Sequence, residues 1–92
     1  MQIDLSTLPT GPGVYLFKDK QSTILYVGKA KHLRRRLASY FRPDHSLPLK
    51  TAAMLRQAVD LETLSTNTEK EALLLEASLI KKHRPRYNIV LR

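Results

Sequence analysis

Residues 13–28, GVYLFKDKQSTILYVG, decide the fold of this chain of 92 residues. Residues 14–17 and 24–27 are runs of β-branched, aromatic and leucine side chains, a composition typical of strands. The connecting residues 18–23 are mostly polar, so the two runs predict an antiparallel β-hairpin. A small antiparallel sheet is therefore expected at the centre of the fold.

The register of this hairpin determines which side chains share a face. Its connection contains no Asn-Gly or Asp-Gly pair, the usual signal of a two-residue turn. If the turn centres between Lys20 and Gln21, the numbers of directly opposed residues sum to 41. That register predicts Tyr15 opposite Tyr26, on the same face of the sheet.

Four further elements follow the hairpin. Apolar residues at helical spacing predict helices over residues 29–41 and 47–58, and alternating polarity predicts a strand over residues 59–66. A capping-box pattern starting at Thr68 opens a helix that continues to residue 83, and residues 86–92 form a basic tail that could add an edge strand. The fold class is therefore α+β: a small three-stranded antiparallel sheet flanked by helices, in the order β-β-α-α-β-α.

The composition excludes several classes of protein. A hydrophobic content of 42% is too high for a disordered basic tail, and the absence of cysteine excludes a disulfide framework or a thiolate metal site. There is no apolar run of about 18 residues and no signal segment at the N-terminus. We therefore expect residues 1–92 to form a single domain in the cytoplasm, with no membrane partner.

The net charge of +8 is unevenly distributed along the chain. Residues 29–42 and 81–92 carry basic side chains and no carboxylate, whereas residues 60–76 are predominantly acidic. Clusters of one sign favour phosphate contact over simple solubility, so a nucleic acid is the expected partner. The residues expected to contact DNA phosphates are Lys31, Arg34, Arg35, Arg42, Lys81, Lys82, Arg84 and Arg86.

One carboxylate lies in an apolar stripe. On a helical wheel of residues 69–83, Glu76 falls between the apolar side chains three and four positions away on either side. Burying an unpaired carboxylate is costly, so Glu76 requires a metal ion, a cation or a hydrogen-bond network. A buried salt bridge, for example to Arg36, is the structural alternative. On the wheel of the first predicted helix, Lys29, Arg36 and Tyr40 share the edge that can reach an enclosed site.

Two tripeptides carry a resemblance to a known family. Gly13-Val14-Tyr15 and Tyr26-Val27-Gly28 resemble the paired motif of the GIY-YIG endonuclease superfamily, with valine at the isoleucine position of both triplets. Further residues of the pattern follow in order: Lys29, Arg36, residues 39–41 (SYF), 71–76 (EALLLE) and 79–88 (LIKKHRPRYN). With these, residues 8–91 are similar to the N-terminal nuclease domains of the UvrC family of bacterial excision-repair subunits.

The resemblance implies a role for each matching residue. Tyr26 matches a tyrosine proposed as general base on the attacking water, and Tyr15 matches the tyrosine that helps to position it. Lys29 and Arg36 match cations near the water and the scissile phosphate, and they would lower the pKa of Tyr26. The other matches are Tyr40, a helix tyrosine of the site, Glu76, the sole acidic metal ligand, and Asn88, a polar residue at the rim.

The implied cofactor is one divalent metal ion, Mg²⁺ or Mn²⁺. A single carboxylate suits an ion that keeps most of its waters and does not suit a two-metal clamp. The general base is open at this point, because a metal-bound hydroxide could replace Tyr26.

The implied function is that of a metal-dependent DNA endonuclease that hydrolyses a phosphodiester bond, with the 3′-side incision of nucleotide excision repair as its reaction. The implied partners are a damaged or distorted DNA duplex and, if the chain is part of a longer protein, repair-complex proteins such as UvrB. The domain itself is expected to be monomeric. The alternatives are a free-standing GIY-YIG structure-specific nuclease and a non-catalytic basic module that binds nucleic acid.

Overall fold

The hairpin predicted from residues 13–28 forms two of the three strands of the sheet. The computed structural model describes residues 1–42 and 47–89. Its elements are the 3-10 helix η1 (Leu5–Thr7), β1 (Gly13–Lys18), β2 (Ile24–Ala30), α1 (Leu33–Ala38), α2 (Leu49–Gln57), β3 (Asp60–Ser65) and α3 (Glu69–His83). The strands lie in the order β2-β1-β3, and both pairs are antiparallel. The predicted fold class and the order β-β-α-α-β-α are confirmed.

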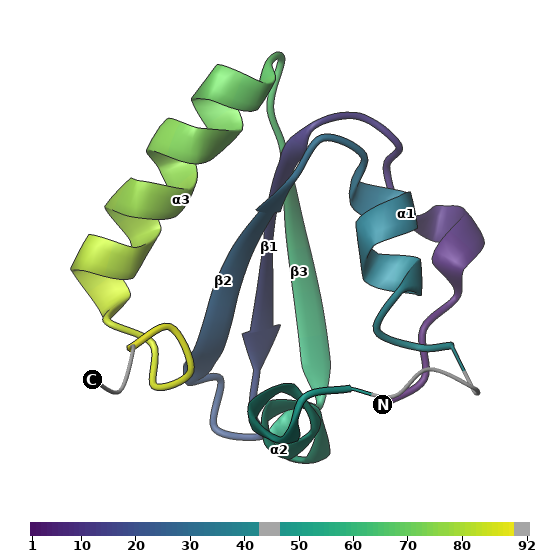
Figure 1. Ribbon diagram of the computed structural model, residues 1–92, viewed down its shortest axis with the longest axis vertical. Helices are drawn as coiled ribbons and strands as arrows, with labels where there is room; N and C mark the ends of the chain where they lie inside the picture. Colours follow the sequence, from purple (N-terminus) through teal and green to yellow (C-terminus); the bar gives the residue numbers. More distant parts are fainter. Residues whose placement is uncertain (43–46, 90–92) are drawn as a thin grey trace.

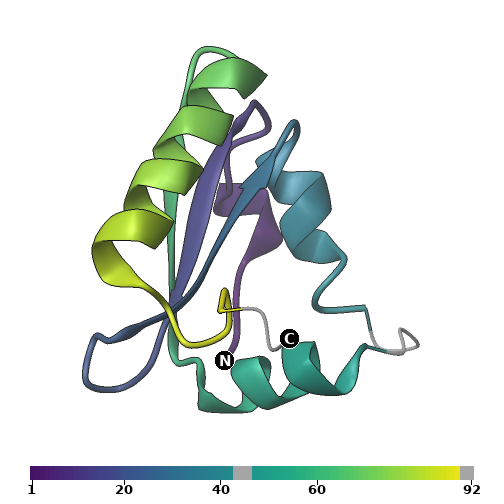
Figure 2. The ribbon, with the colours of Figure 1, turned by 60° about the vertical axis from the view of Figure 1, so that its left-hand side comes forward.

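Helices cover both faces of the sheet (Figures 1 and 2). α3 packs against β1 and β2 on one face, and α1 and α2 lie on the other side. The buried cluster on the side of α1 and α2 includes Tyr15, Phe17, Leu33, Leu37 and Met54, and the cluster under α3 includes Val14, Leu16, Val27 and Ala72. Since β1 alternates between the two clusters, Tyr15 belongs to the face that carries α1 and α2.

The register of the hairpin differs from the predicted one by two residues. Tyr15 lies opposite Gly28, and Phe17 lies opposite Tyr26, so the prediction that Tyr15 opposes Tyr26 is wrong. A shift of two residues preserves the face, and both tyrosines still lie on the same side of the sheet. Their rings remain neighbours on the diagonal, with centroids 6.2 Å apart.

The turn explains the different register. The Asp19 carboxylate accepts hydrogen bonds from the backbone N–H groups of Gln21 (2.9 Å) and Thr23 (3.0 Å). Ser22 adopts a left-handed conformation with φ of 64°, and the strand pairing is irregular between Phe17 and Lys18. An Asp-centred turn of this kind has no symmetric midpoint, so counting from the middle of the connection gave the wrong pairing.

The second strand continues past the position where a helix was predicted. β2 extends to Ala30, and Lys29 pairs with Val14 in the strand. The helix starts only at Leu33, after His32, whose Nδ1 accepts a hydrogen bond from the backbone N–H of Arg35 at 3.1 Å. The prediction that Lys29 lies on a helix is therefore wrong, because strand pairing with β1 outweighs the helical spacing of the apolar residues.

α3 follows the prediction from residue 69 onward. Thr68 caps it, since its hydroxyl accepts a hydrogen bond from the Glu71 N–H at 3.1 Å. Residues 86–89 form a turn and not an edge strand, and residues 90–92 of the predicted tail lie outside the described residues. Within residues 1–42 and 47–89, none of the helices has the length and apolar character needed to span a membrane.

Candidate active site at the free edge of the sheet

A chain of contacts between polar side chains joins β1 to α1. The hydroxyl oxygens of Tyr15 and Tyr40 are 2.8 Å apart, and Arg36 Nε donates a hydrogen bond to the Tyr15 hydroxyl at 3.3 Å. The guanidinium carbon of Arg36 also lies 5.2 Å from the centre of the Tyr40 ring, within the range of a cation–π interaction. Both contacts restrain Arg36, so its charge has a fixed position beside the two hydroxyls.

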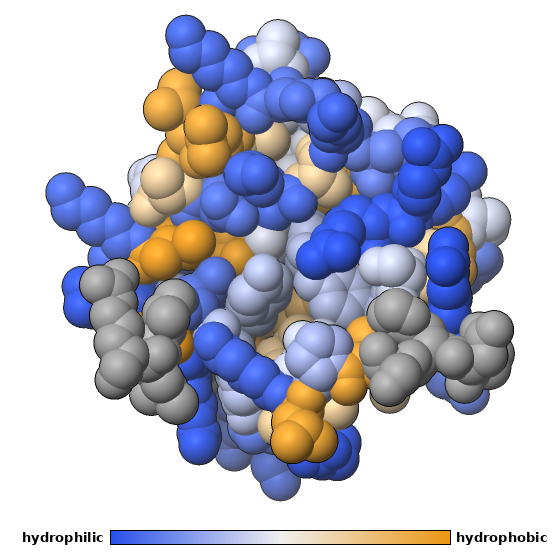
Figure 3. All heavy atoms as spheres, in the orientation of Figure 1, coloured by the Kyte–Doolittle hydropathy of each residue, from blue (hydrophilic) through white to orange (hydrophobic). Residues whose placement is uncertain are grey.

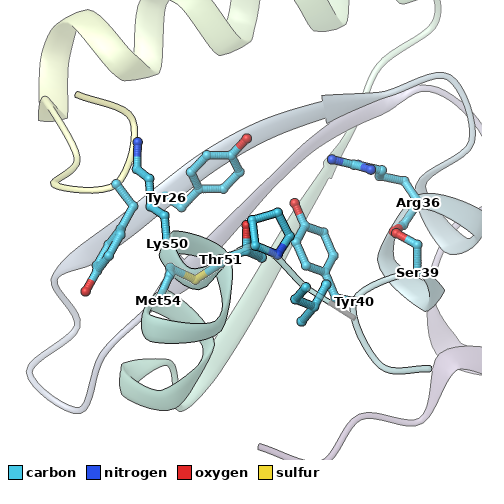
Figure 4. Close-up of a pocket in the computed structure, with 10 residues that line it drawn as sticks. Tyr26, Arg36, Ser39, Tyr40, Lys50, Thr51 and Met54 are labelled. Carbon is cyan, nitrogen blue, oxygen red and sulfur yellow. The ribbon is translucent and has the colours of Figure 1, made fainter. Parts of the chain in front are cut away.

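Tyr26 lies next to this group on β2, the edge strand. Figure 4 shows the hydroxyls of Tyr26 and Tyr40 and the guanidinium of Arg36 turned toward the same space. This space is a pocket of about 380 Å³ between β2, α1 and α2. Its other lining residues are Ser39, Leu47, Pro48, Lys50, Thr51, Met54 and Tyr87. The pocket brings together three of the predicted site residues.

Glu76 approaches Tyr26 from α3. The carboxylate is half-buried, and it lines a second hollow together with Asn88. Burial raises the pKa of Tyr26, and the proximity of the Tyr15 hydroxyl and of the Glu76 carboxylate raises it further. Among residues 1–42 and 47–89, Lys18 and Glu62 form an ion pair at 2.6 Å, and no other ion pair is present. The predicted alternative for Glu76, a buried salt bridge to Arg36, is therefore not formed.

The donor groups around Glu76 fit a divalent cation bound mainly through water. In the part of the chain that the structure describes, no group of three or more His, Cys, Asp or Glu side chains comes together. A hard cation such as Mg²⁺ accepts one carboxylate and keeps several waters. Glu76 is half-buried and forms no ion pair within residues 1–42 and 47–89, so its carboxylate can supply the negative charge and is the group of this site that could hold the ion.

Lys29 does not join the tyrosines. Because it is paired with Val14, its side chain lies on the face of the sheet that carries α3. There it lines a hollow with Glu69 and Lys70, at the N-terminal end of α3. The predicted edge shared by Lys29, Arg36 and Tyr40 therefore holds for Arg36 and Tyr40 and is wrong for Lys29.

Gly28 makes room for the Tyr15 side chain. A Cβ atom at this position would overlap the ring and the hydroxyl of Tyr15, the residue of β1 that pairs with Gly28. Gly13 is similarly restricted, since a Cβ there would overlap the Leu64 carbonyl and the Leu33 side chain. Both glycines of the paired motif are thus required by close packing at the site.

The fold and the site agree with the comparison to known families. Residues 11–89 match the family described as the UvrC-like GIY-YIG domain. The chain belongs to this family. Among curated relatives, UvrABC system protein C of Oleidesulfovibrio alaskensis is 71% identical over 91 residues, and that of Nitratidesulfovibrio vulgaris is 73% identical over 89 residues. These matches cover 99% and 97% of this chain but 13% of each relative, so the chain spans about an eighth of their length.

Solved structures give the same family. One is the GIY-YIG N-terminal endonuclease domain of UvrC from Thermotoga maritima, bound to its catalytic divalent cation, magnesium. It is 42% identical to this chain, with a TM-score of 0.82, and the match covers 97% of this chain and 100% of the other. A tyrosine-to-phenylalanine mutant of that domain, bound to the catalytic divalent cation, matches with a TM-score of 0.83 at 40% identity, covering 98% and 100%.

In this GIY-YIG domain, the pKa of Tyr26 is raised, whereas the sequence predicted a lowered one. Burial has the largest effect, and the proximity of Tyr15 adds to it. Arg36 lowers the pKa, as predicted, but it does not outweigh burial. Lys29 does not contribute because it lies on the other face of the sheet. Tyr26 therefore carries its proton at neutral pH in the free domain.

Burial and the nearby Tyr40 also raise the pKa of Tyr15, although Arg36 opposes the shift. The pKa of Tyr15 in the folded state exceeds the unfolded value of about 10. The contribution of the neutral Tyr15 hydroxyl to folding stability is therefore complete below pH ~10 and is lost as pH rises beyond it. We expect the free energy of unfolding to fall less in Tyr15→Phe than in the wild type between pH ~9 and ~12. Urea titrations across this range measure the difference, and parallel curves for the two proteins would contradict the expectation.

Asn88 closes the free edge of β2. Its side-chain Oδ1 accepts a hydrogen bond from the Val27 N–H, and its Nδ2 donates one to the Val27 carbonyl, both at 2.8 Å. The backbone N–H of Tyr87 adds a bond to the Leu25 carbonyl at 3.0 Å. Asn88 and the Tyr87 backbone thus take the place of a neighbouring strand, and together they hold the backbone on either side of Tyr26.

Replacing Asn88 tests this pairing. Asn88→Ala removes both bonds to Val27 and is expected to lower the free energy of unfolding by about 1–3 kcal/mol. Asn88→Asp keeps the acceptor for the N–H but turns a carboxylate oxygen toward the Val27 carbonyl, so the loss at neutral pH should be at least as large as for alanine. Urea unfolding measures both variants, and wild-type stability in either one would refute the role.

Basic residues of the stretch 29–42, the first basic block, line the surface next to the pocket. Lys31, Arg35, Arg36 and Arg42 line a shallow hollow beside His32. Arg36 also lines the tyrosine pocket, so the two depressions meet at this residue. The sugar-phosphate backbone of a DNA strand bound at the tyrosines could continue along these cations. Hydrophilic side chains cover most of the face in Figure 3, with apolar atoms gathered over α3 and α2.

Arg34 has a different role from the other cations of this block. Its Nε and Nη2 donate hydrogen bonds to the Leu8 carbonyl at 3.0 and 2.7 Å, and Nη2 also donates to the Ser6 carbonyl at 3.0 Å. These bonds hold the N-terminal segment, including η1, against α1. The prediction that Arg34 contacts DNA has no support in this geometry.

Residues 81–92 form the second basic stretch of the sequence, the second basic block, and part of it lies near Glu76. Lys81 and Arg84 line the hollow that contains the Glu76 carboxylate. The other two predicted contacts, Lys82 and Arg86, are exposed. Positive charges therefore lie on both sides of Tyr26, and phosphates could approach the site from either direction.

The contribution of α2 to the site was not predicted from the sequence. Lys50, Thr51 and Met54 line the tyrosine pocket, yet they lie in an ordinary amphipathic segment far from the motif residues. Met54 is buried, whereas Leu49 at the start of α2 is 90% exposed. Figure 1 shows α2 nearly along its axis, at the lower end of the sheet. Which of its residues face the site depends on this tertiary position and could not be read from the sequence.

Proposed function

We propose that this GIY-YIG domain is an endonuclease that hydrolyses a DNA phosphodiester bond with the help of one divalent cation. The observation that carries the proposal is the position of Tyr26, between the Arg36–Tyr15–Tyr40 group on one side and the half-buried Glu76 carboxylate on the other. Hydrolysis of a phosphodiester needs a positioned water, relief of negative charge on the phosphate and help for the leaving oxygen. Separate side chains of this site can supply each of these.

Tyr26 would orient the attacking water. Its raised pKa keeps the hydroxyl protonated at neutral pH, so it can accept a hydrogen bond from water and donate one to a phosphate oxygen. Arg36 lowers the pKa of that hydroxyl, so it would favour release of the tyrosine proton to the phosphate oxygen while the Tyr26 oxygen takes up the proton of the attacking water. Tyr15 and Tyr40 would hold Arg36 in place during the reaction.

Arg36 would also stabilise the charge that develops on the phosphate. Its Nε is engaged by Tyr15, and the rest of the guanidinium faces the pocket (Figure 4). A restrained guanidinium next to the reacting phosphate costs little reorganisation at the moment of reaction, which is the basis of its effect on rate.

Glu76 would hold the divalent ion, with water filling its other coordination positions. When bound, a divalent ion polarises the phosphate and offsets negative charge on the leaving oxygen. Magnesium is the cation named for the Thermotoga maritima domain, and we propose that Mg²⁺ or Mn²⁺ serves here. Both ions prefer oxygen ligands, as Glu76 provides.

The substrate we propose is a damaged or distorted DNA duplex, cut on the 3′ side of the lesion during nucleotide excision repair. Support comes from the UvrABC system protein C relatives and from the two basic surfaces beside Tyr26. Residues 1–92 would act as one monomeric nuclease domain, and repair-complex proteins such as UvrB would direct it when it is part of a longer chain.

Nicking of supercoiled plasmid by the 92-residue chain tests the activity and the choice of metal. We expect conversion to open circles with Mg²⁺ or Mn²⁺ and none with EDTA. With Ca²⁺, which takes more ligands at longer distances, the rate should fall well below that with Mg²⁺. Equal rates with EDTA and Mg²⁺ would rule out metal-dependent cleavage.

A further inference from the structure

The pocket beside Tyr26 extends beyond the groups that the proposed reaction uses. Tyr26, Arg36 and Tyr40 form one wall, and the opposite wall is formed by α2 and Tyr87. Its volume of about 380 Å³ lies in the range of small-molecule sites, roughly 300–1,000 Å³, and exceeds what a phosphate group needs. The additional space adjoins the position where the scissile phosphate would lie.

We propose that this pocket binds one unstacked nucleobase of the DNA strand, next to the phosphate that is cut. The inference rests on the proposed function, because a phosphate held at Arg36 and Tyr26 brings its own nucleoside to the mouth of the pocket. The base would enter between Tyr40 and α2, with its flat face against the aromatic and apolar lining.

The apolar part of the lining suits a flat aromatic ligand. Met54 is 2% exposed and Tyr40 is 9% exposed, and both line the pocket. The rings of Tyr26 and Tyr87 line it as well. Aromatic rings stack on bases regardless of sequence, and a thioether side chain adapts to differently shaped apolar surfaces. This combination favours a nucleobase over a free phosphate or a sugar.

Polar groups on α2 complement the edge of a base. Thr51 and Lys50 both line the pocket, and in Figure 4 the Lys50 ammonium extends toward the loop that follows α3. Among the described residues, the ammonium donates a hydrogen bond to the Ile89 carbonyl, at a long distance of 3.4 Å. Hydroxyl and ammonium groups can pair with the acceptors on the edges of all four bases, so the pocket is expected to discriminate little between them.

The far wall is fixed in place before any ligand enters. Gln57 Nε2 on α2 donates a hydrogen bond to the Tyr87 hydroxyl at 2.5 Å. The Tyr87 backbone N–H is bonded to the Leu25 carbonyl on β2. Since Tyr87 is tied to both α2 and the sheet, the pocket has a preformed shape, and a base would lose little binding energy to ordering it.

A nucleobase site would give the domain a reason to prefer distorted DNA. Unstacking a base from a regular duplex is costly, and the cost is least for a mismatched, damaged or unpaired base. A distorted duplex would therefore fill the pocket more readily than regular DNA, and its scissile phosphate would be held longer at Arg36 and Tyr26.

Titration with a mononucleotide tests the pocket without DNA cleavage. In EDTA, 2′-deoxyadenosine 5′-monophosphate and 2-deoxyribose 5-phosphate are each added to the wild-type chain, and the two methionine methyl signals are followed by NMR. We expect the nucleotide to shift the Met54 methyl in a saturable way and to leave Met1 unchanged, and we expect the sugar phosphate to shift neither. Equal effects of the two compounds, or no saturable shift of Met54, would overturn the inference.

Two substitutions on α2 complete the test. Thr51→Phe fills the pocket from a half-buried position, and Leu49→Phe adds the same ring at a fully exposed position of the same helix. Thr51→Phe should weaken nucleotide binding at least tenfold, whereas Leu49→Phe should bind as the wild type does. Unchanged binding by a folded Thr51→Phe would refute the proposed site. The titration contains no metal and no DNA, so a failure to nick would count against the nuclease proposal alone.

Discussion

Glu76→Gln is expected to reduce metal-dependent nicking by about 10²- to 10³-fold or more, which is the cost of removing one group that stabilises transition-state charge. Glutamine keeps the size and shape of the side chain but removes the negative charge that would hold the cation. Because Glu76 is half-buried and makes no ion pair within residues 1–42 and 47–89, the fold should be unaffected. Single-turnover nicking at saturating Mg²⁺, with circular dichroism as a folding check, measures the effect.

The matched control for this variant is Glu71→Gln. Glu71 lies on the same helix, in its exposed first turn, where its charge favours the helix N-terminus. Its replacement should leave the nicking rate within about twofold of the wild type and lower the stability by less than about 1 kcal/mol. If Glu76→Gln nicked as fast as Glu71→Gln, the metal would have to bind elsewhere.

Gly28→Ala is expected to lower both stability and activity. The new Cβ would overlap the ring and hydroxyl of Tyr15, which is only 1% exposed and cannot move aside. Overpacking of this kind typically costs about 1–3 kcal/mol. Displacing the Tyr15 hydroxyl would also displace Arg36, and a shift of about 1 Å in a catalytic group can cost about 10²-fold in rate.

Gly11→Ala provides the comparison for Gly28→Ala. No heavy atom lies within 4 Å of a Cβ built at Gly11, and its φ is not positive, so alanine fits there. We expect wild-type activity and a stability equal to or slightly above that of the wild type. Urea unfolding and nicking of both variants would show whether close packing at Gly28 is the cause. Equal behaviour of the two variants would exclude it.

The sequence was sufficient for the fold class and for much of the candidate site. Strand runs, the cap at Thr68 and the spacing of Arg36 and Tyr40 depend on neighbouring residues, so local rules describe them well. Glu76 could be identified because a carboxylate in an apolar stripe is unusual. The structure adds that its charge helps to raise the pKa of Tyr26, an effect that helical spacing alone could not reveal.

Other features depended on tertiary structure and were wrong or absent in the sequence interpretation. The hairpin register depends on the Asp19 turn, and the position of Lys29 depends on how far β2 pairs with β1. The direction of the Tyr26 pKa depends on how deeply the side chain is buried, which outweighs the nearby Arg36. In each case a long-range arrangement prevailed over a local pattern or a single charge.

The position of the site at a sheet edge explains why several layers can contribute to it. β2 is an edge strand, and within residues 1–42 and 47–89 its free side is closed by Asn88 and the backbone of Tyr87. Tyr26 on this strand is therefore accessible to α1 from one face and to α3 from the other. A central strand such as β1 could not present one side chain to both layers.

The most direct test of this account measures binding and cleavage of the same DNA. The 92-residue chain is incubated with a duplex that contains one distorted site, and bound and nicked fractions are followed in Mg²⁺ and in EDTA. We expect binding in both conditions and nicking only in Mg²⁺. A chain that binds this duplex equally in both but never nicks it would contradict the account and leave a basic nucleic-acid-binding module in its place.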